Sequence, residues 1–200
     1  MKGAPAEQSC APIHAPMPTP QGLTVWFTGL SAAGKSTLAR TAAAELADLG
    51  LRTEVLDADD LRKHLNRDLG FTKADRDENI RRIAYIANLL TRHGVVVLVA
   101  AVSPYRAARD EARQSIGAFA EVHVDAPLAV CEMRDPIGLY RRQRAGELHH
   151  IAGVDDPYEP PLAPELHCRT DEETIQESVA KVVSLVLGLT RKPANSGNPE

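Results

Sequence analysis

Two kinds of hydrophobic pattern alternate along the chain. Short, nearly continuous apolar runs rich in β-branched residues are separated by longer segments in which apolar residues recur every three or four positions. A strand buried on both faces has the first pattern, whereas an amphipathic helix has the second. The apolar runs predict strands over residues 23–28, 53–57, 95–102 and 121–125.

The segments between these runs predict helices. The expected helices span residues 35–49, about 75–93, 105–114, 128–135 and 173–187. In the last of these, Ile175, Val179, Val182 and Val186 lie at helical spacing and predict a stripe that faces the core. Strands that alternate with helices are typical of successive βαβ units. The chain is therefore predicted to be an α/β protein, a three-layer sandwich in which helices flank a twisted, mainly parallel sheet.

Both ends of the chain lack this pattern. Residues 1–21 carry five prolines among small residues, and residues 190–200 contain proline, asparagine and glycine. Segments of this composition bury too little apolar surface to offset the entropy of ordering. We predict disordered tails at 1–21 and 190–200 and one folded domain over residues 22–189.

The charge and the cysteine content exclude several classes of protein. A formal net charge of −4 provides no global basic field for nucleic acid. Cys10, Cys131 and Cys168 have neither CxxC nor metal-ligand spacing, which favours a reducing compartment. No apolar run reaches the roughly 20 residues that span a bilayer. We therefore expect a cytoplasmic protein that binds neither nucleic acid nor membrane.

A glycine-rich loop follows the first predicted strand. It reads Gly29-Leu30-Ser31-Ala32-Ala33-Gly34-Lys35-Ser36-Thr37. This run fits the phosphate-loop pattern GxxxxGK[ST] in its required setting between a strand and a helix. The glycines permit a cradle of inward-facing N–H groups at the positive end of the following helix. We expect the loop to bind ATP, with Lys35 on the β and γ phosphates and Ser36 as a ligand of Mg²⁺.

Phosphate loops occur in several enzyme classes, and two absences narrow the choice. The sequence has no NKxD-type segment to read guanine and no DxxG segment after a strand, so a GTPase is disfavoured. The chain is also too short for the additional modules of a motor ATPase. The remaining interpretation is a kinase that phosphorylates a small-molecule hydroxyl.

Charged side chains cluster over residues 57–62, at the end of the second predicted strand. Ligands of open α/β sheets bind at the carboxyl ends of the strands, so the phosphoryl acceptor is expected here. Asp59 is the candidate to receive the proton of the acceptor hydroxyl, and Asp57 is the candidate to hold Mg²⁺ together with Ser36. Alternatively, these aspartates cap a helix that starts near Leu61. The two roles are compatible.

Two further segments are expected at the same edge. Arg76 and Asn79 lie early in a predicted helix, where cations are unfavourable, so an anionic ligand is expected to contact them. The third strand brings Val102 and Ser103 to this edge. Ser103 is also suited to cap the next helix, with Pro104 in its first turn.

Together these segments resemble the adenylylsulfate kinases, which phosphorylate the 3′-hydroxyl of adenosine 5′-phosphosulfate with MgATP. Besides the phosphate loop, the matching segments are 68–71, 76–82, 103–106, 134–135, 138–140, 144–147 and 156–159. They cover nearly the whole predicted domain in the family's order.

The resemblance implies a P-loop NTPase-type fold with a mobile lid over about residues 135–160. The implied acceptor contacts are Arg62, Phe71, Arg76 and Asn79. It also implies that Ser103 corresponds to a serine proposed to carry the phosphoryl group as an intermediate. Direct in-line transfer is the simpler mechanism, because positioning and electrostatics suffice for this chemistry. Members of the family are often dimers, so a homodimer is expected.

The chain departs from the family's usual pattern at three places on the acceptor side. Residues 57–60 read Asp-Ala-Asp-Asp instead of Asp-Gly-Asp-Asn. Ile137 replaces a lysine, and Ile151 replaces a phenylalanine that closes over the substrate adenine opposite Phe71. Loss of a stacked ring and of a charge-assisted contact costs about 2 to 5 kcal/mol if the two terms add. That cost is enough to redirect a kinase to another acceptor.

Three functions remain open from the sequence. The first is an adenylylsulfate kinase with a modified adenine clamp. The second is a related kinase that phosphorylates a sugar hydroxyl of another nucleotide or nucleoside-like metabolite in a specialised biosynthetic pathway. The third is a nucleotide-binding protein without turnover, which the presence of Lys35, Ser36, Asp59 and Arg76 disfavours.

Overall fold

The computed structural model describes residues 22–190 of the 200-residue chain. These residues contain a five-stranded parallel sheet in the order β2-β3-β1-β4-β5. The strands are β1 (Leu23–Thr28), β2 (Thr53–Asp57), β3 (Val96–Ala100), β4 (Phe119–Asp125) and β5 (Leu166–Arg169). The predicted parallel sheet is confirmed.

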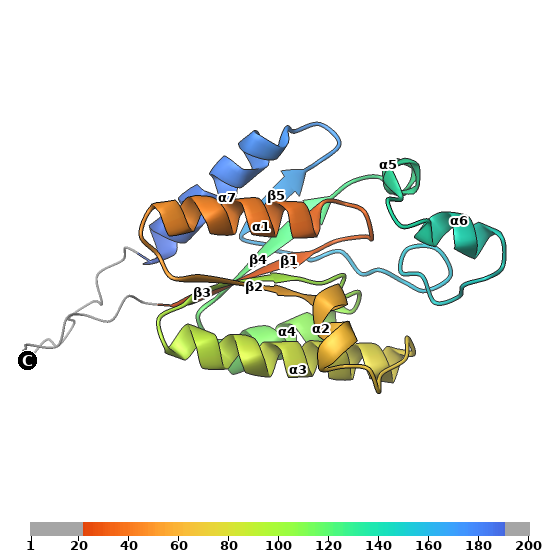
Figure 1. Cartoon of the computed structure of the whole chain (residues 1–200), viewed down its shortest axis with the longest axis horizontal. Coiled ribbons are helices and arrows are strands. Elements are labelled where there is room, and N and C mark those ends of the chain that lie inside the picture. Colours follow the sequence, from red (N-terminus) through yellow and green to blue (C-terminus); the bar gives the residue numbers. More distant parts are fainter. Residues whose placement is uncertain (1–21, 191–200) are drawn as a thin grey trace, which may run out of the picture.

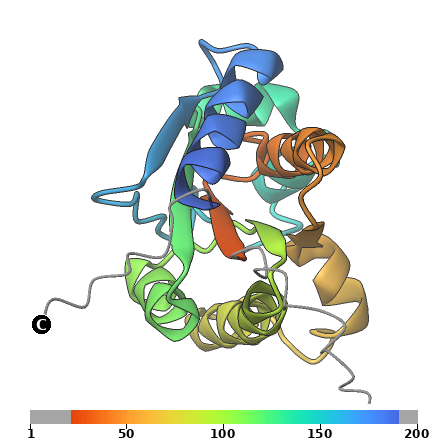
Figure 2. The same cartoon turned by 90° about the vertical axis from the view of Figure 1, so that its left-hand side faces the viewer.

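Helices cover both faces of this sheet (Figure 1). They are α1 (Lys35–Asp48), α2 (Ala58–His64), α3 (Lys73–Arg92), α4 (Arg106–Ile116), α5 (Leu128–Arg134), α6 (Leu139–Arg144) and α7 (Ile175–Thr190). Figure 2 shows α1 and α7 on one side of the sheet and α3 and α4 on the other. The predicted three-layer α/β sandwich is confirmed. No helix among residues 22–190 is long and apolar enough to cross a membrane.

The central strand β1 explains why the sheet needs two helical layers. All six of its residues are buried, and successive side chains point to opposite faces. Phe27 packs into the cluster formed with α1 and α7, whereas Trp26 packs into the cluster formed with α3 and α4. The stripe predicted on the last helix is confirmed at Val179, Val182 and Val186, which are fully buried, whereas Ile175 at the start of α7 is exposed.

Most predicted element boundaries are close to the observed ones. β1 and β2 have the predicted bounds, β3 is shorter at both ends, and β4 starts two residues earlier than predicted. The sequence prediction missed β5 and α6, and it offered α2 only as the alternative of a helix near Leu61. The tails predicted to be disordered lie outside the described residues, except that Thr190 is the last residue of α7.

Two local expectations are wrong. Ser103 does not cap α4, because that helix begins at Arg106 after the N-cap residue Tyr105, and Pro104 lies outside it. Helix α3 begins earlier than expected, at Lys73, and is capped by Thr72. There the Thr72 and Asp75 side chains form a capping box, and Asp75 places an acid in the first turn, directly before Arg76.

The carboxyl ends of the strands lie at one end of the molecule. The loop between β1 and α1, the helices α2, α5 and α6, and the first turn of α3 all gather there (Figure 1). This end is where open α/β sheets bind their ligands.

Candidate active site

The loop between β1 and α1 has a backbone shape that requires glycine. Gly29 has φ of 155°, and a Cβ atom built there would lie 2.2 Å from the carbonyl oxygen of Val124. Gly34 has φ of 106° and is the N-cap residue of the 14-residue helix α1. The predicted phosphate loop therefore ends at a helix N-terminus, where free N–H groups and the helix dipole favour an anion.

Lys35 is the buried cation of this loop. Its side chain is 8% exposed, and Nζ donates a hydrogen bond to the carbonyl oxygen of Leu30 at 2.7 Å. Burial lowers the pKa of Lys35 to about 8, although the nearby carboxylates of Asp59 and Asp57 favour the charged form. The ammonium group is thus held inside the cradle in which the phosphates are predicted to bind.

The end of β2 is organised around Asp57. Its carboxylate is buried, accepts the backbone N–H of Asp59 at 3.0 Å and accepts a guanidinium N–H of Arg40 at 2.9 Å. Asp57 therefore caps α2, so the capping alternative is confirmed at this position. Asp59 lies in the first turn of α2. The extra charge of Asp60 is balanced by Lys63 at 2.8 Å and Arg40 at 3.4 Å.

Three of the predicted acceptor residues come together. The guanidinium of Arg62 lies 4.5 Å from the centre of the Phe71 ring, and that of Arg76 lies 5.7 Å from it. Arg62 also donates hydrogen bonds to the carbonyl oxygens of Leu69 and Gly70. The Phe71 ring is half exposed, whereas the two arginines beside it are partly buried, with only 11% of the Arg76 side chain exposed.

Asn79, unlike the Arg62, Phe71 and Arg76 group, is buried. It is 6% exposed, and its side-chain oxygen accepts a hydrogen bond from the Asn66 amide at 2.9 Å. Asn66 is also buried. The pair fixes the segment after α2 to helix α3, so the side chain of Asn79 has a packing role in addition to the predicted ligand contact.

The segment predicted to be a lid contacts both halves of the site. Arg76 donates to the carbonyl oxygen of His150 and lies 3.8 Å from the carboxylate of Asp156. From α6, the hydroxyl of Tyr140 donates to the carbonyl oxygen of Ser31 in the phosphate loop at 2.9 Å. These contacts link residues 135–160 to the donor loop and to the acceptor residues.

The two isoleucines that we expected to replace family residues, Ile137 and Ile151, lie in different environments. Ile151 is 8% exposed and belongs to the core cluster on the α1 side of the sheet, next to a turn in which Gly153 approaches Leu30 closely. Ile137 is 74% exposed. A larger ring at position 151 would have to displace packed atoms, whereas a lysine at position 137 would not.

Ser103 is buried and fully engaged. It has φ of 40°, its hydroxyl accepts a hydrogen bond from the Trp26 indole at 3.0 Å, and it donates to the carbonyl oxygen of Ala101. The neighbouring Val102 accepts a hydrogen bond from the Thr28 hydroxyl through its carbonyl oxygen. The third strand thus reaches the predicted edge, but the serine hydroxyl already has partners.

A buried arginine links the segment after β3 to the end of the predicted lid. Arg109 is 2% exposed and pairs with Glu121 at 2.6 Å. It also donates to the carbonyl oxygens of Ser103 and Glu159, which joins the third strand to the end of the lid segment. Sequence reasoning missed Arg109, because nothing in its local sequence distinguishes it from the exposed charges of α4.

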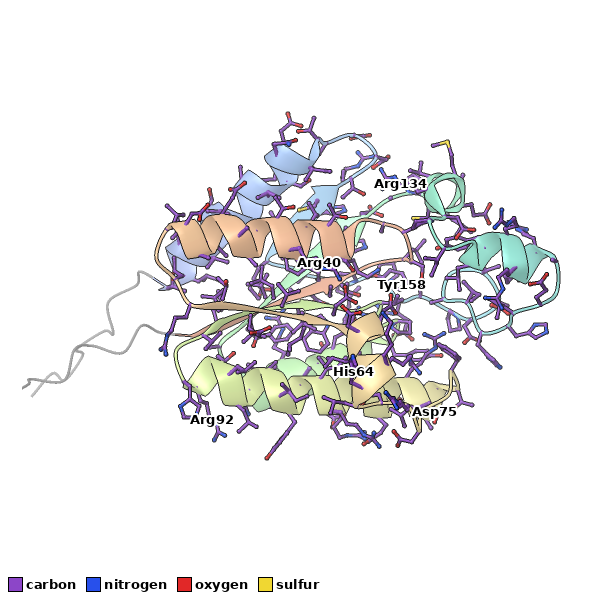
Figure 3. The ribbon with its side chains drawn as sticks, viewed as in Figure 1. Arg40, His64, Asp75, Arg92, Arg134 and Tyr158 are labelled. Carbon is purple, nitrogen blue, oxygen red and sulfur yellow. The ribbon has the colours of Figure 1, made fainter. Side chains whose placement is uncertain are left out.

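Other missed contacts involve two tyrosines, Tyr140 and Tyr158. The Tyr158 hydroxyl lies 3.1 Å from that of Thr28, just before the phosphate loop. Both tyrosines stand in segments that carry the family resemblance, which was the available signal. Figure 3 labels Asp75, Arg134 and Tyr158 at the ligand-binding end of the molecule and Arg92 at the opposite end of α3.

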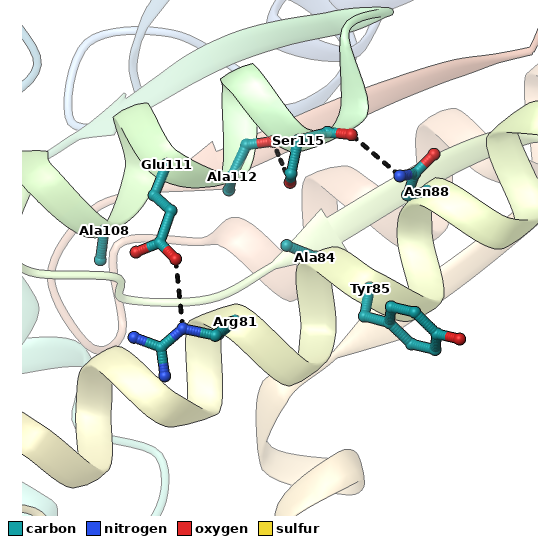
Figure 4. Close-up of a pocket in the computed structure, with 8 residues that line it drawn as sticks. All are labelled: Arg81, Ala84, Tyr85, Asn88, Ala108, Glu111, Ala112 and Ser115. Carbon is teal, nitrogen blue, oxygen red and sulfur yellow. Dashed lines mark hydrogen bonds and ion pairs between the residues drawn. The ribbon is translucent and has the colours of Figure 1, made fainter.

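A separate cavity of about 140 Å³ lies between α3 and α4 (Figure 4). There Arg81 pairs with Glu111, and Asn88 donates to the carbonyl oxygen of Ser115. The cavity contains none of the predicted site residues. Its volume is below the roughly 300 Å³ at which ligand pockets begin, so it is too small for a nucleotide.

The fold and site define a class. The parts of a P-loop phosphotransferase are present: a glycine-rich loop between a central parallel strand and a helix, a buried lysine within the loop, and carboxylates at the end of another strand of the same sheet. Residues 21–169 match the sequence profile of the adenylylsulphate kinases. The chain belongs to the adenylylsulphate kinase family.

Individual relatives agree with this membership. The chain is 60% identical over 163 residues to the adenylyl-sulfate kinase of Synechococcus sp. (strain JA-3-3Ab), a match that covers 82% of the chain and 93% of the relative. It is 61% identical over 162 residues to that of Microcystis aeruginosa, covering 81% and 90%. The solved structure of the Mycobacterium tuberculosis APS kinase in complex with AMPPNP and APS is 46% identical. It superposes with a TM-score of 0.81 over 84% of this chain and 98% of that one.

Proposed function

We propose that this protein is an adenylyl-sulfate kinase. It transfers the γ-phosphoryl group of ATP to the 3′-hydroxyl of adenosine 5′-phosphosulfate (APS), which yields ADP and 3′-phosphoadenosine 5′-phosphosulfate. The observation that carries this proposal is the phosphate loop with its buried Lys35, facing Asp57 and Asp59, in a chain about 60% identical to adenylyl-sulfate kinases.

The donor half is proposed to use the loop and two metal-binding groups. The loop N–H groups and Lys35 hold the β and γ phosphates in place. Ser36 follows Lys35 in α1, and Asp57 ends β2, so a hydroxyl and a carboxylate would supply the oxygen ligands that Mg²⁺ prefers. Bound there, Mg²⁺ would neutralise charge on the β and γ phosphates. The hydrogen bonds from Arg40 and the Asp59 N–H fix the orientation of the Asp57 carboxylate.

The acceptor half is proposed to act mainly by positioning. Asp59 orients the 3′-hydroxyl and accepts its proton while the hydroxyl oxygen forms the new bond to the γ phosphorus and the bond to ADP breaks. Phe71 stacks on the adenine, and Arg62 and Arg76 attract the anionic groups of the acceptor. The Ser103 hydroxyl is held by Trp26 and Ala101, so transfer is proposed to be direct rather than through a phosphoserine.

The test is a purified-protein assay with ATP and Mg²⁺. We expect turnover with APS and negligible ADP formation with other nucleotides and nucleosides. The isoleucines at positions 137 and 151 are the features that favour the alternative function, a kinase for a different acceptor. If ADP formed with another nucleotide and not with APS, the related kinase of a specialised pathway would be the correct function.

Restoring the usual family residues is expected to improve acceptor binding. The double variant Ile137→Lys/Ile151→Phe should lower the KM for APS if the larger ring displaces the atoms packed around position 151 and reaches the adenine, because it then adds a cation and an aromatic ring to the proposed clamp. Steady-state kinetics at saturating ATP measure the effect. Leu162→Lys is the matched control, since Leu162 is 83% exposed and lies outside the clamp. An unchanged or higher KM in the double variant would show that the clamp is elsewhere.

We also propose that the protein acts in the cytoplasm as a homodimer, which rests on the family resemblance. Light scattering of the full-length chain is expected to give the mass of two chains. A single-chain mass at micromolar concentration would contradict the homodimer.

A further inference from the structure

Two histidines and an aspartate meet at the β4–β5 edge of the sheet, away from the residues assigned to catalysis. His123 and Asp125 are two positions apart on β4 and therefore share a face, and His167 is paired with His123 across the strands. The potential ligand atoms of the three side chains all lie within 4.8 Å of one another. Nε2 of His167 lies 2.9 Å from Oδ2 of Asp125. Among residues 22–190, this is the only such group of three.

We propose that His123, Asp125 and His167 bind a divalent transition-metal ion such as Zn²⁺. Two imidazoles and one carboxylate are ligands that Zn²⁺, Co²⁺ and Ni²⁺ accept, whereas Mg²⁺ prefers oxygen ligands in octahedral geometry. Ligand atoms bound at about 2.0 to 2.2 Å from a tetrahedral ion lie about 3.3 to 3.6 Å apart. The observed separations are close enough that side-chain rotations bring the three atoms together. The remaining coordination position is left for water.

The surrounding rings orient the first histidine. The His123 ring stacks on the His167 ring with 4.9 Å between centres, and on the Tyr158 ring with 6.2 Å. Tyr158 is in turn held through its hydroxyl by Thr28. Neighbours that fix a ligating ring raise the metal affinity of a site.

An ion bound at this position would stabilise the edge of the sheet that lies next to the phosphate loop. β5 is a four-residue edge strand, and the ion would link it to β4 through side chains. The carbonyl oxygen of Asp125 accepts the N–H of Thr170, whose hydroxyl donates to the carbonyl oxygen of Ala33 in the loop at 2.7 Å. The site therefore adjoins the donor loop without belonging to it. The proposal does not depend on which acceptor the enzyme uses.

The experiment uses the full-length protein after removal of metals by chelation and dialysis. Titration with Zn²⁺ alone, followed by calorimetry, is expected to show one ion bound per chain at micromolar concentration. Titration with Co²⁺ is expected to produce the visible absorption of a four- or five-coordinate ion. Excess Mg²⁺ should displace neither, and Zn²⁺ should raise the melting temperature. Failure of the wild-type protein to bind one ion would overturn the proposal.

Matched variants locate the site. His123→Phe keeps a ring that stacks on Tyr158 but removes a ligand, so the affinity is expected to fall by about 100-fold or more, and the rise in melting temperature should vanish. Asp125→Asn is a second variant if His123→Phe does not fold, as judged by circular dichroism. The control is His149→Gln/His150→Gln, since these histidines lie near Asp155 and Asp156. Undiminished binding in both site variants, or loss of binding in the control, would contradict the proposal.

Discussion

Replacing Lys35 by alanine is expected to lower kcat/KM for any acceptor by at least about 10²- to 10³-fold, because catalysis of phosphoryl transfer depends on positioned positive charge. The ammonium lies buried in the phosphate loop, where it donates a hydrogen bond to the carbonyl oxygen of Leu30. Steady-state kinetics with ATP and APS measure the loss.

Two further variants test whether the position of the Lys35 ammonium matters as well as its charge, and one of them is a control. Lys35→Arg keeps the charge but replaces a compact ammonium with a planar guanidinium, so activity should also be low. Lys181→Ala removes an exposed lysine of α7 that pairs with Glu173 at 2.9 Å and should leave activity unchanged. Full activity of the Lys35→Ala variant would refute the phosphate-loop mechanism.

The affinity for ATP is expected to weaken as the pH rises from 7 to 9. Burial lowers the pKa of Lys35 to about 8, so its ammonium form decreases as the pH rises through that value. At pH 9 only about a tenth of the unliganded protein keeps this charge. Bound phosphates favour the ammonium form, so ATP binding above pH 8 takes up a proton. Calorimetry in buffers with different ionisation enthalpies measures this uptake. An ATP affinity that stays constant between pH 7 and pH 9 would contradict this prediction.

Arg109→Met is expected to destabilise the folded protein by about 3 to 5 kcal/mol. The substitution leaves the buried carboxylate of Glu121 without its closest cation, and removing one partner of a buried pair has a cost of this size. The carbonyl oxygens of Ser103 and Glu159 lose a donor at the same time. Urea denaturation of the purified variant gives the free energy of unfolding.

Two controls distinguish this buried pair from ordinary surface charge. Arg142→Met breaks an exposed pair with Glu147 and should cost less than about 1 kcal/mol. Arg109→Met/Glu121→Gln should recover part of the stability, because the buried charge is removed with its partner. Equal unfolding free energies for the wild type and Arg109→Met would show that the pair contributes nothing.

The layered fold was predictable because its central strands are continuous apolar runs. Residues 23–28 form such a run in the central strand β1, and the bounds of β1 and of the edge strand β2 were predicted correctly. β5 was missed because Leu166–Arg169 is short and mixes polar with apolar residues, and only pairing with β4 makes it a strand. Helix α6 has only six residues, most of them polar, so its sequence is too short to show a helical periodicity.

The site was predictable where local sequence determines geometry. The phosphate loop is such a case, because its glycines and the flanking strand and helix are contiguous. Arg109 is the opposite case, since its three partners come from residues 103, 121 and 159, which only the tertiary fold brings together. The cap of α4 was mispredicted for a related reason. The bond from the Trp26 indole holds Ser103 before the helix begins.

The stacking of Arg62 and Arg76 on one phenylalanine has a consequence for discrimination among metabolites. Burial and the neighbouring Arg76 lower the pKa of Arg62, although a guanidinium stays protonated. Two like charges at one ring repel each other, and the carboxylate of Asp156, 3.8 Å from Arg76, offsets part of that repulsion. If the acceptor binds here as proposed, an anionic nucleotide relieves that repulsion and an uncharged nucleoside does not. The site would then discriminate among candidate acceptors by their charge before it recognises their base or sugar.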